Sequence, residues 1–150
     1  MELGSFTLGT LFGILIASLI NHFLAKIRAS ESRKQQQKYS AASDLRKAFT
    51  NELLALHPNR HRNEEDLYNV LLEALPKHQI AVEEFAVHLS SEKKEDFMAA
   101  WYEYSHYEGL ADSPEYLEQY SRYGISISEY EEACELAISR IKKLLSYASK

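Results

Sequence analysis

The sequence predicts an all-α protein in which one N-terminal transmembrane helix is followed by a small cytoplasmic helical bundle. An apolar run without formal charge lies between Glu2 and Lys26. The later part of the chain repeats apolar residues at spacings of three and four, the period of a helix. No stretch sustains the alternation of a β-strand, since the alternation at residues 124–127 is too short to build a sheet.

Residues 3–25 are expected to cross a bilayer once. A helix of this length rises about 34 Å, which slightly exceeds a hydrocarbon core of roughly 30 Å. Residues 11–20 are apolar around the whole circumference, unlike a buried helix of a water-soluble protein. A cleaved secretory signal would need basic residues before the run and a small-x-small site, and the sequence has neither. The run is therefore predicted to stay as an anchor.

Basic residues crowd the carboxyl side of this span and are missing from its amino side. They are Lys26, Arg28, Arg33, Lys34 and Lys38. The positive-inside rule then places residues 26–150 in the cytoplasm and Met1 outside. A single cysteine and no Asn-x-Ser/Thr site also favour a reducing compartment.

Small side chains recur every four residues along one face of the predicted span. This stripe consists of Ser5, Gly9, Gly13, Ala17 and Asn21. Small residues let two membrane helices approach closely, so the stripe predicts self-association or docking on a partner's span. The alternative is a chance match, because glycine is common in spans generally.

Residues 26–43 are polar and contain neither Pro nor Gly. They are expected to form either a basic helical stalk that lies on anionic headgroups or a solvated linker whose charges serve only topology. The chain is thus divided into an anchor at 1–25, a stalk or linker at 26–43 and a helical domain at 44–150. Nucleic-acid binding is not expected, because residues 63–150 are strongly acidic.

Three helices are predicted in the first half of the domain. Ser43 caps the first, over 44–56, before Pro58. The second begins after Asn63 with the acidic first turn Glu64–Asp66, and it is kinked or restarted at Pro76 before it continues to residue 89. Ser90 or Ser91 begins the third, for which Gly109 is a plausible terminator. Their predicted buried stripes are Leu45, Ala48, Phe49, Leu53 and Leu56, then Leu67, Val70, Leu71, Ala74, Leu75, Ala81, Val82, Phe85 and Leu89, then Phe97, Ala100, Trp101 and Tyr104.

Two further helices are predicted after Gly109. Pro114 at a first helical position predicts a short helix from Ser113 to about Tyr123. Ser128 and Glu131 form a capping box for the last helix. Its apolar residues Cys134, Ala137, Ile141, Leu144 and Ala148 predict core packing rather than an exposed coiled-coil surface.

Candidate chemistry is sparse in this sequence. Glu103 and His106 are one helical turn apart, as in di-iron bundles, but the second Glu-x-x-His that such sites need is absent. No nucleophile motif, phosphate-binding glycine loop or cysteine cluster is present. No catalytic, cofactor-binding or metal-binding residue is therefore assigned, no cofactor is expected, and the protein is not predicted to be an enzyme.

Aromatic residues cluster between residues 101 and 130, which contain most of the ten tyrosines and the only tryptophan. Tyrosine and tryptophan are enriched in protein interfaces. We call the following residues the docking patch: Trp101, Tyr104, Tyr107, Tyr116, Tyr120 and Tyr123. In an acidic domain this patch predicts docking of a basic partner. The alternative is a helical core whose rim is lined by tyrosines.

Parts of the chain resemble known proteins. The runs Phe49–Leu53 and Ala74–His78, together with the apolar residues up to Tyr104, resemble a set of uncharacterised bacterial proteins with a single span and a small helical cytoplasmic domain. The resemblance covers roughly residues 1–107. It implies an inner-membrane setting and a helical domain, and it carries no activity.

The expected function is that of a membrane-anchored helical interaction module, an accessory or scaffold subunit that holds a protein partner or a second copy at the membrane. One alternative is an enzyme or metal-binding bundle with an unrecognised site, for which Glu103 and His106 are the candidate pair. Another is a small subunit of a larger membrane complex, in which the span makes the main contact.

Overall fold

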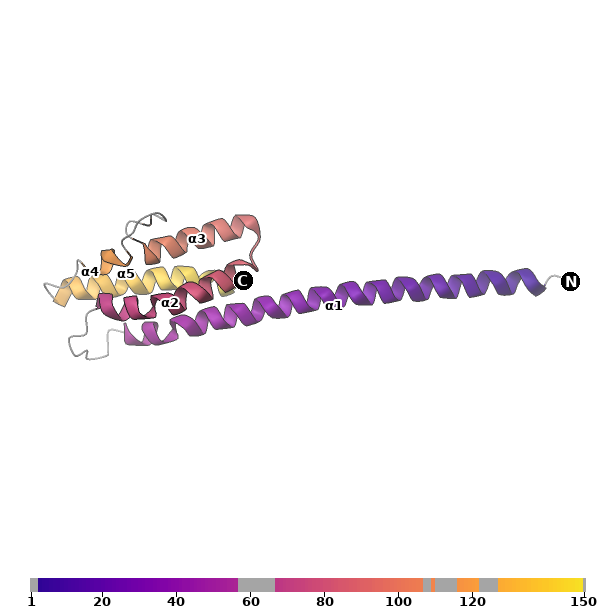
Figure 1. Ribbon diagram of the computed structural model, residues 1–150, viewed down its shortest axis with the longest axis horizontal. Helices are drawn as coiled ribbons and strands as arrows, with labels where there is room; N and C mark the ends of the chain where they lie inside the picture. The colour runs from indigo at the N-terminus through magenta and orange to yellow at the C-terminus, as the bar shows by residue number, and fades with distance from the viewer. Residues whose placement is uncertain (1–2, 57–66, 107–108, 110–115, 122–126, 150) are drawn as a thin grey trace. The chain divides into compact units, whose positions relative to one another are not determined.

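The structure, a computed structural model, describes residues 3–56, 67–106, 109, 116–121 and 127–149 (Figure 1). The side chains of residues 3–15, 121, 127 and 128 are outside this description. The described residues form helices and their connections, and their one isolated β-bridge pairs His106 with Tyr116. The predicted all-helical class is therefore confirmed.

The helical elements of the described residues follow one another in chain order. They are α1 (Leu3–Ala55), α2 (Leu67–Ala86), α3 (Ser91–Ser105), α4 (Glu118–Ser121), α5 (Ile127–Ser146) and the 3-10 helix η2 (Tyr147–Ser149). The chain divides into two units, Met1–Gln37 and Lys38–Lys150.

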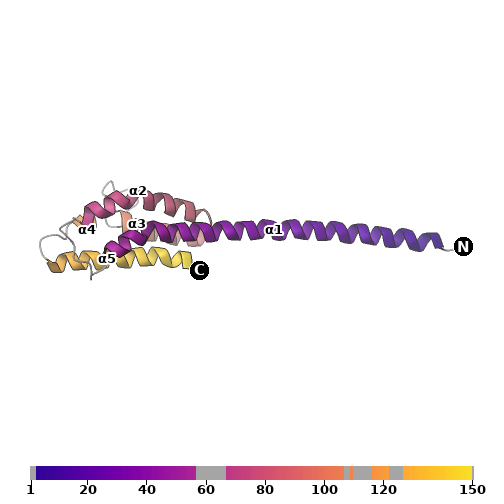
Figure 2. The same ribbon diagram turned by 90° about the horizontal axis from the view of Figure 1, so that it is seen from below.

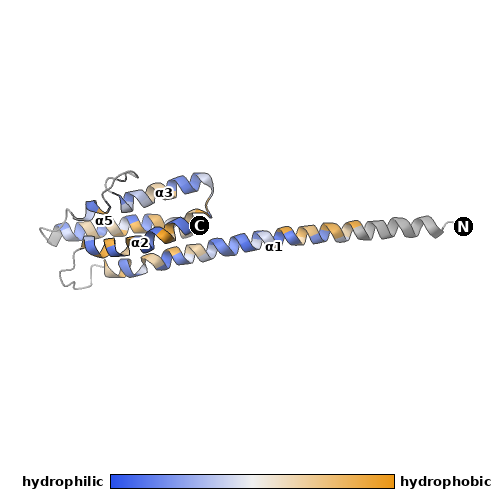
Figure 3. Cartoon of the chain, in the orientation of Figure 1, coloured by the Kyte–Doolittle hydropathy of each residue, from blue (hydrophilic) through white to orange (hydrophobic). Residues whose placement is uncertain are grey.

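The first unit is helical, since α1 continues without a break through residues 26–43. Of the two alternatives for this segment, the structure has the helix. Figure 3 shows an apolar stretch of α1 followed by a hydrophilic stretch. Within the described residues, helices fall short of the length and apolarity needed to cross a membrane. The predicted span begins with residues 3–15, whose side chains lie outside those described.

The second unit is a bundle in which successive helices run in alternating directions. The carboxyl-terminal part of α1, then α2, α3 and α5 lie side by side in two perpendicular views (Figures 1 and 2). Short connections favour this up-and-down arrangement, as between Ala86 and Ser91. The helix α4 lies in the longer connection between α3 and α5.

Most of the predicted stripe residues lie in the core of the bundle, whereas Leu53, Val70, Ala74 and Leu89 are only partly buried. Leu45 and Phe49 of α1, Phe85 of α2, Phe97 of α3 and Ile141 of α5 have no exposed surface. The rings of Phe85 and Phe97 pack edge to face with centroids 5.3 Å apart. All five apolar residues predicted for the last helix are buried, so its prediction as a core helix is confirmed.

Three predicted helix boundaries differ in the structure. The predicted cap Ser43 lies inside the continuous helix α1. The helix α2 passes through Pro76 without restarting. The helix α3 ends at Ser105 rather than near Gly109, because His106 adopts an extended conformation (φ −114°, ψ 148°). This conformation lets His106 pair with Tyr116, and a local sequence pattern does not contain such a distant contact.

The short helix after Gly109 is also shorter than predicted. Within the expected range 113–123, α4 covers only Glu118–Ser121, while 110–115 and 122–126 lie outside the described residues. Leu117 has a φ of +60° and is fully buried, so the chain turns sharply before α4. The last helix begins at Ile127, which puts the predicted cap Ser128 inside its first turn.

Candidate functional site

A row of polar side chains crosses the apolar core from α1 to α3. The Nε2 atom of His78 in α2 lies 3.2 Å from Oε2 of Glu52 in α1. The Nδ1 atom of His78 lies 3.0 Å from the hydroxyl oxygen of Tyr104 in α3. Phe49 stacks on the imidazole at a centroid distance of 3.8 Å. We call Glu52, His78 and Tyr104 the core polar triad.

The chemistry of the groups assigns the protons in this triad. A carboxylate only accepts hydrogen bonds, so Nε2 of neutral His78 carries the hydrogen and Nδ1 accepts from the Tyr104 hydroxyl. The Nε2–Oε2 contact is within ion-pair distance but lacks hydrogen-bond alignment. Lys77 lies 3.8 Å from the other Glu52 oxygen and provides its counter-charge at the surface.

Burial dominates the acid–base properties of the triad. Desolvation lowers the pKa of His78, although the nearby Glu52 carboxylate acts in the opposite direction. Desolvation also raises the pKa of Tyr104 well above its ordinary value, with smaller contributions from Tyr120 and Glu52. Both groups are therefore neutral at physiological pH.

The triad has no access to a substrate in the described part of the chain. His78 and Tyr104 have no exposed surface. A surface cavity of about 260 Å³ lies elsewhere in the bundle, lined by Lys38, Leu89, Lys93, Asp96, Ser146 and Tyr147. The triad thus links the packing of α1, α2 and α3, because the contacts among its side chains form only when the three helices keep this register.

A second polar contact joins His106 to the preceding residue, Ser105. The Ser105 hydroxyl donates to the Trp101 carbonyl (2.8 Å), so it accepts from Nδ1–H of His106 at 2.7 Å. The His106 ring packs against Tyr116 at a centroid distance of 4.7 Å. Desolvation lowers the pKa of His106. Because Ser105 is fully buried, this Ser–His pair does not offer a nucleophile to solvent.

A third group of polar atoms lies around Tyr120. Burial raises the pKa of Tyr120, against the opposing effects of Arg140 and Gln119. The Arg140 guanidinium carbon is 5.8 Å from the centre of the Tyr120 ring. Among the described residues, Tyr120 OH, Gln119 Oε1 and Arg140 Nη1 are buried without hydrogen-bond partners.

The burial of several residues contradicts part of the predicted docking patch. Trp101, Tyr104 and Tyr120 belong to the core, with Tyr104 and Tyr120 fully buried. Tyr116 is 43% exposed and remains available to a partner. Tyr107 and Tyr123 lie outside the described residues. Trp101 and Tyr104 do not contribute to a docking surface, because the helical spacing of α3 directs them inwards.

The candidate metal pair is also separated. Lys143 binds the Glu103 carboxylate at 2.6 Å, while the His106 ring lies against Ser105 and Tyr116. The pair therefore does not share a helix face, since α3 ends between its two members. The described residues contain no group of three His, Cys, Asp or Glu that could hold a metal ion.

The span stripe is only partly described. Ala17 and Asn21 are exposed on α1, whereas the side chains at positions 5, 9 and 13 lie outside the described residues. One helical turn separates Ala17 from Asn21, so both lie on one face of α1.

Sequence reasoning missed Glu52 and His78. A signal was present, because His78 falls on the apolar period of α2 between Leu75 and Val82. A histidine at such a position is expected in the core. Its partner Glu52 had no local signal, because their contact joins two helices.

These features define an all-helical bundle with a polar contact network in its core. The chain matches no known family model, no functionally characterised protein and no solved structure. Function is therefore argued from the chain's own surfaces.

Proposed function

We propose that the protein is a membrane-anchored helical interaction module. In this role it is an accessory or scaffold subunit at the cytoplasmic face of a bacterial inner membrane. The first part of α1 crosses the membrane with Met1 outside, and the bundle holds a protein partner on the cytoplasmic side.

The observation that carries this proposal is an uncovered apolar helix. Six large apolar side chains of α1 are each between 42% and 69% exposed: Ile16, Leu19, Ile20, Phe23, Leu24 and Ile27. They follow one another at spacings of three and four residues, so they form one broad apolar face of α1. Exposure of apolar surface to water costs about 25 cal/mol per Å². Lipid around the helix removes this cost.

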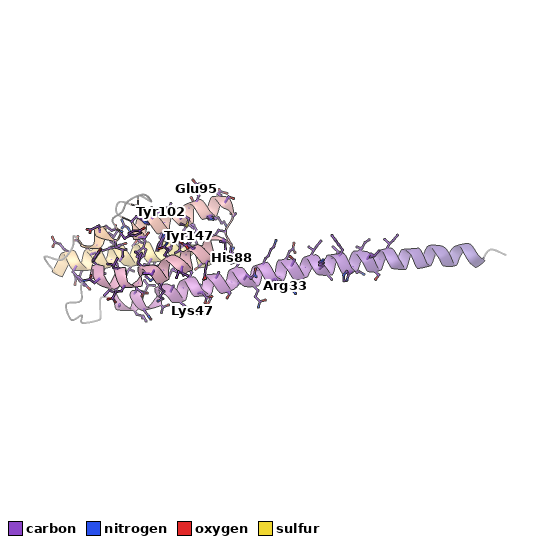
Figure 4. All side chains as sticks on the ribbon, in the orientation of Figure 1. Arg33, Lys47, His88, Glu95, Tyr102 and Tyr147 are labelled. Carbon is purple, nitrogen blue, oxygen red and sulfur yellow. The ribbon has the colours of Figure 1, made fainter. Side chains whose placement is uncertain are left out.

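Charge supports the direction of the anchor. Lys26, Arg28, Arg33 and Lys34 are exposed on α1, directly after the apolar residues. Arg33 points away from the helix in Figure 4. Basic side chains at this place favour retention on the cytoplasmic side, where each contributes about 1 kcal/mol near anionic headgroups.

Membrane extraction tests the anchor. After carbonate washing of vesicles, we expect the full-length chain in the pellet and the Ile16→Lys/Ile20→Lys variant largely in the supernatant, because each lysine at the centre of a span costs about 3 kcal/mol. The matched control is Ser40→Lys/Thr50→Lys, which adds the same charge at exposed positions. Wild-type protein in the supernatant would overturn the proposal.

A second candidate function is a small subunit of a larger membrane complex. Exposed Ala17 and Asn21 on one face of α1 favour it, because a small and a polar residue together permit close helix contact and an interhelical hydrogen bond. Here the span, rather than the bundle, makes the main contact.

A further inference from the structure

The helix α2 has an apolar face that the bundle leaves uncovered. Leu72, Pro76 and Ile80 follow one another at single helical turns, and Val87 continues the line just beyond the helix end. Leu72, Ile80 and Val87 are 39%, 59% and 69% exposed, and Pro76 is exposed as well. We call these four residues the outer stripe. The opposite side of α2 is fully used by the core.

Acidic residues border the outer stripe. Glu73, Glu83 and Glu84 are exposed on α2. Gln79 donates to Glu83 at 3.0 Å, which leaves the negative charge in place. The one lysine of α2, Lys77, lies toward Glu52 in α1. Glu73 lies beside the stripe, and Glu83 and Glu84 lie one turn after Ile80, so the face combines apolar side chains with negative charge; we call these three residues the acidic border.

Pro76 adds an acceptor to this face. Proline has no amide hydrogen, so it leaves the carbonyl of Leu72 without its usual donor four residues later. Hydrogen-bond donors on a partner are favoured at this point, and a lysine or arginine side chain has the required donors.

We propose that the outer stripe binds an amphipathic helix of a partner protein, one whose apolar stripe is flanked by lysine or arginine. Apolar residues at spacings of three and four on that helix pack along α2, and its basic flanks face Glu73, Glu83 and Glu84. This inference rests on the proposed function as an interaction module and names its docking surface and partner class.

Charge favours a basic helix over two other candidate occupants of the outer stripe. A second copy would bring two acidic borders together, and like charges across an interface are repulsive. An anionic lipid surface would be repelled by the same glutamates. A basic helix is the occupant for which both the apolar centre and the border are favourable.

The test uses the full-length chain in phosphatidylcholine nanodiscs. The probe is a fluorescently labelled synthetic helix with a leucine stripe flanked by lysines, and empty nanodiscs give the background. We expect saturable binding by fluorescence anisotropy and at least a tenfold weaker affinity for Ile80→Lys. Ala99→Lys, which adds the same charge at an exposed position of α3, is expected to stay within twofold of wild type.

A second variant with its matched control tests the acidic border. Glu83→Gln/Glu84→Gln is expected to weaken binding severalfold and to flatten its salt dependence. Glu131→Gln/Glu132→Gln removes the same charge from exposed positions of α5 and is expected to have little effect. If Ile80→Lys lowers the melting temperature, Val87→Lys, outside the helix, replaces it.

Equal effects of Ile80→Lys and Ala99→Lys, or no saturable binding, would overturn the proposal. So would self-association of the wild type that Ile80→Lys abolishes, since a second copy would then cover the face. The anchor is tested separately: a chain that resists carbonate but shows no Ile80-dependent binding refutes only the docking surface. A chain that carbonate extracts but that binds the probe refutes only the anchor.

Discussion

His78 occupies a position that the helical spacing of α2 gives to an apolar residue. Its imidazole is tolerated there because Phe49 stacks on the ring and Tyr104 supplies a hydrogen bond. A buried polar group without a partner costs about 1–3 kcal/mol. The three members of the core polar triad should therefore be energetically coupled.

A double-mutant cycle measures this coupling. Tyr104→Phe alone is expected to lower the free energy of unfolding by about 1–2 kcal/mol, because Nδ1 of His78 loses its donor. His78→Phe alone leaves the Tyr104 hydroxyl without its acceptor. The double variant should lose less than the sum by at least about 0.5 kcal/mol in urea unfolding followed by circular dichroism. Additive losses would show that the two side chains do not interact.

The lowered pKa of His78 predicts a pH dependence of stability. The unfolded chain binds a proton near pH 6.5, whereas the buried imidazole stays neutral to lower pH. As the pH falls below about 6.5, the unfolded state binds more protons and the free energy of unfolding decreases. Above that pH the full stability is present. Urea midpoints between about pH 5 and about pH 7.5 measure the effect.

The control for this pH dependence is His78→Phe. Its slope should be shallower and should not vanish, because the pKa of His106 is also lowered by burial and acts in the same direction. An unchanged slope in the variant would exclude His78 as a source.

Leu117 combines full burial with a left-handed backbone. Leu117→Ala is expected to cost about 3 kcal/mol through lost packing. Leu117→Gly should cost about 1 kcal/mol less than the alanine variant, because glycine adopts positive φ without strain. At Ile141, buried within α5, the order should reverse, with glycine worse by about 1 kcal/mol. The same order at both sites in thermal unfolding would contradict the strain at Leu117.

At the scale of the elements, the sequence predicts what depends on local periodicity. The helices α2, α3 and α5 were predicted from apolar spacing, and their buried faces agree with it. Tyr104 shows how two signals compete: it lies on the apolar period of α3 and also in a tyrosine-rich segment. The spacing was the correct guide, because it reflects which side of the helix meets the core.

The contacts made after α3 could not be predicted from local periodicity. The bridge between His106 and Tyr116 and the hydrogen bond from the Leu117 amide to the Ser105 carbonyl (3.0 Å) join distant positions. Such contacts depend on tertiary packing, and α3 accordingly ends at Ser105, before the predicted terminator Gly109. The contacts between Glu52 and His78 and between Lys143 and Glu103 escaped prediction for the same reason.

Pro76 gives a prediction for the helix α2. The residue is exposed inside a continuous helix, so its side chain contributes little packing while its missing amide removes one hydrogen bond. Pro76→Ala is expected to raise the free energy of unfolding by about 1–2 kcal/mol, after the loss of proline's effect on the unfolded chain. A rise in melting temperature measures this gain. A fall would mean that the ring of Pro76 supports packing.

At the scale of the whole molecule, the two units differ in what covers their apolar surface. In the bundle, apolar side chains cover one another. In the first unit, large apolar side chains of α1 are exposed and need another cover. This cover is either lipid alone or lipid together with a second helix. Substitutions distinguish the two, because only contact with a second helix depends on which face of α1 is changed.

Ala17→Ile tests for such a second helix. An enlarged side chain at Ala17 would hold two helices apart on the face that also carries Asn21, so association in a membrane two-hybrid assay is expected to fall severalfold. Ser18→Ile is the matched control, since it adds comparable bulk one residue along, about 100° around the helix. A loss with Ala17→Ile alone would favour span-to-span contact as the main interaction. Equal signals from both variants and wild type would mean that the small residues do not mediate contact, and partner binding would then depend on the bundle.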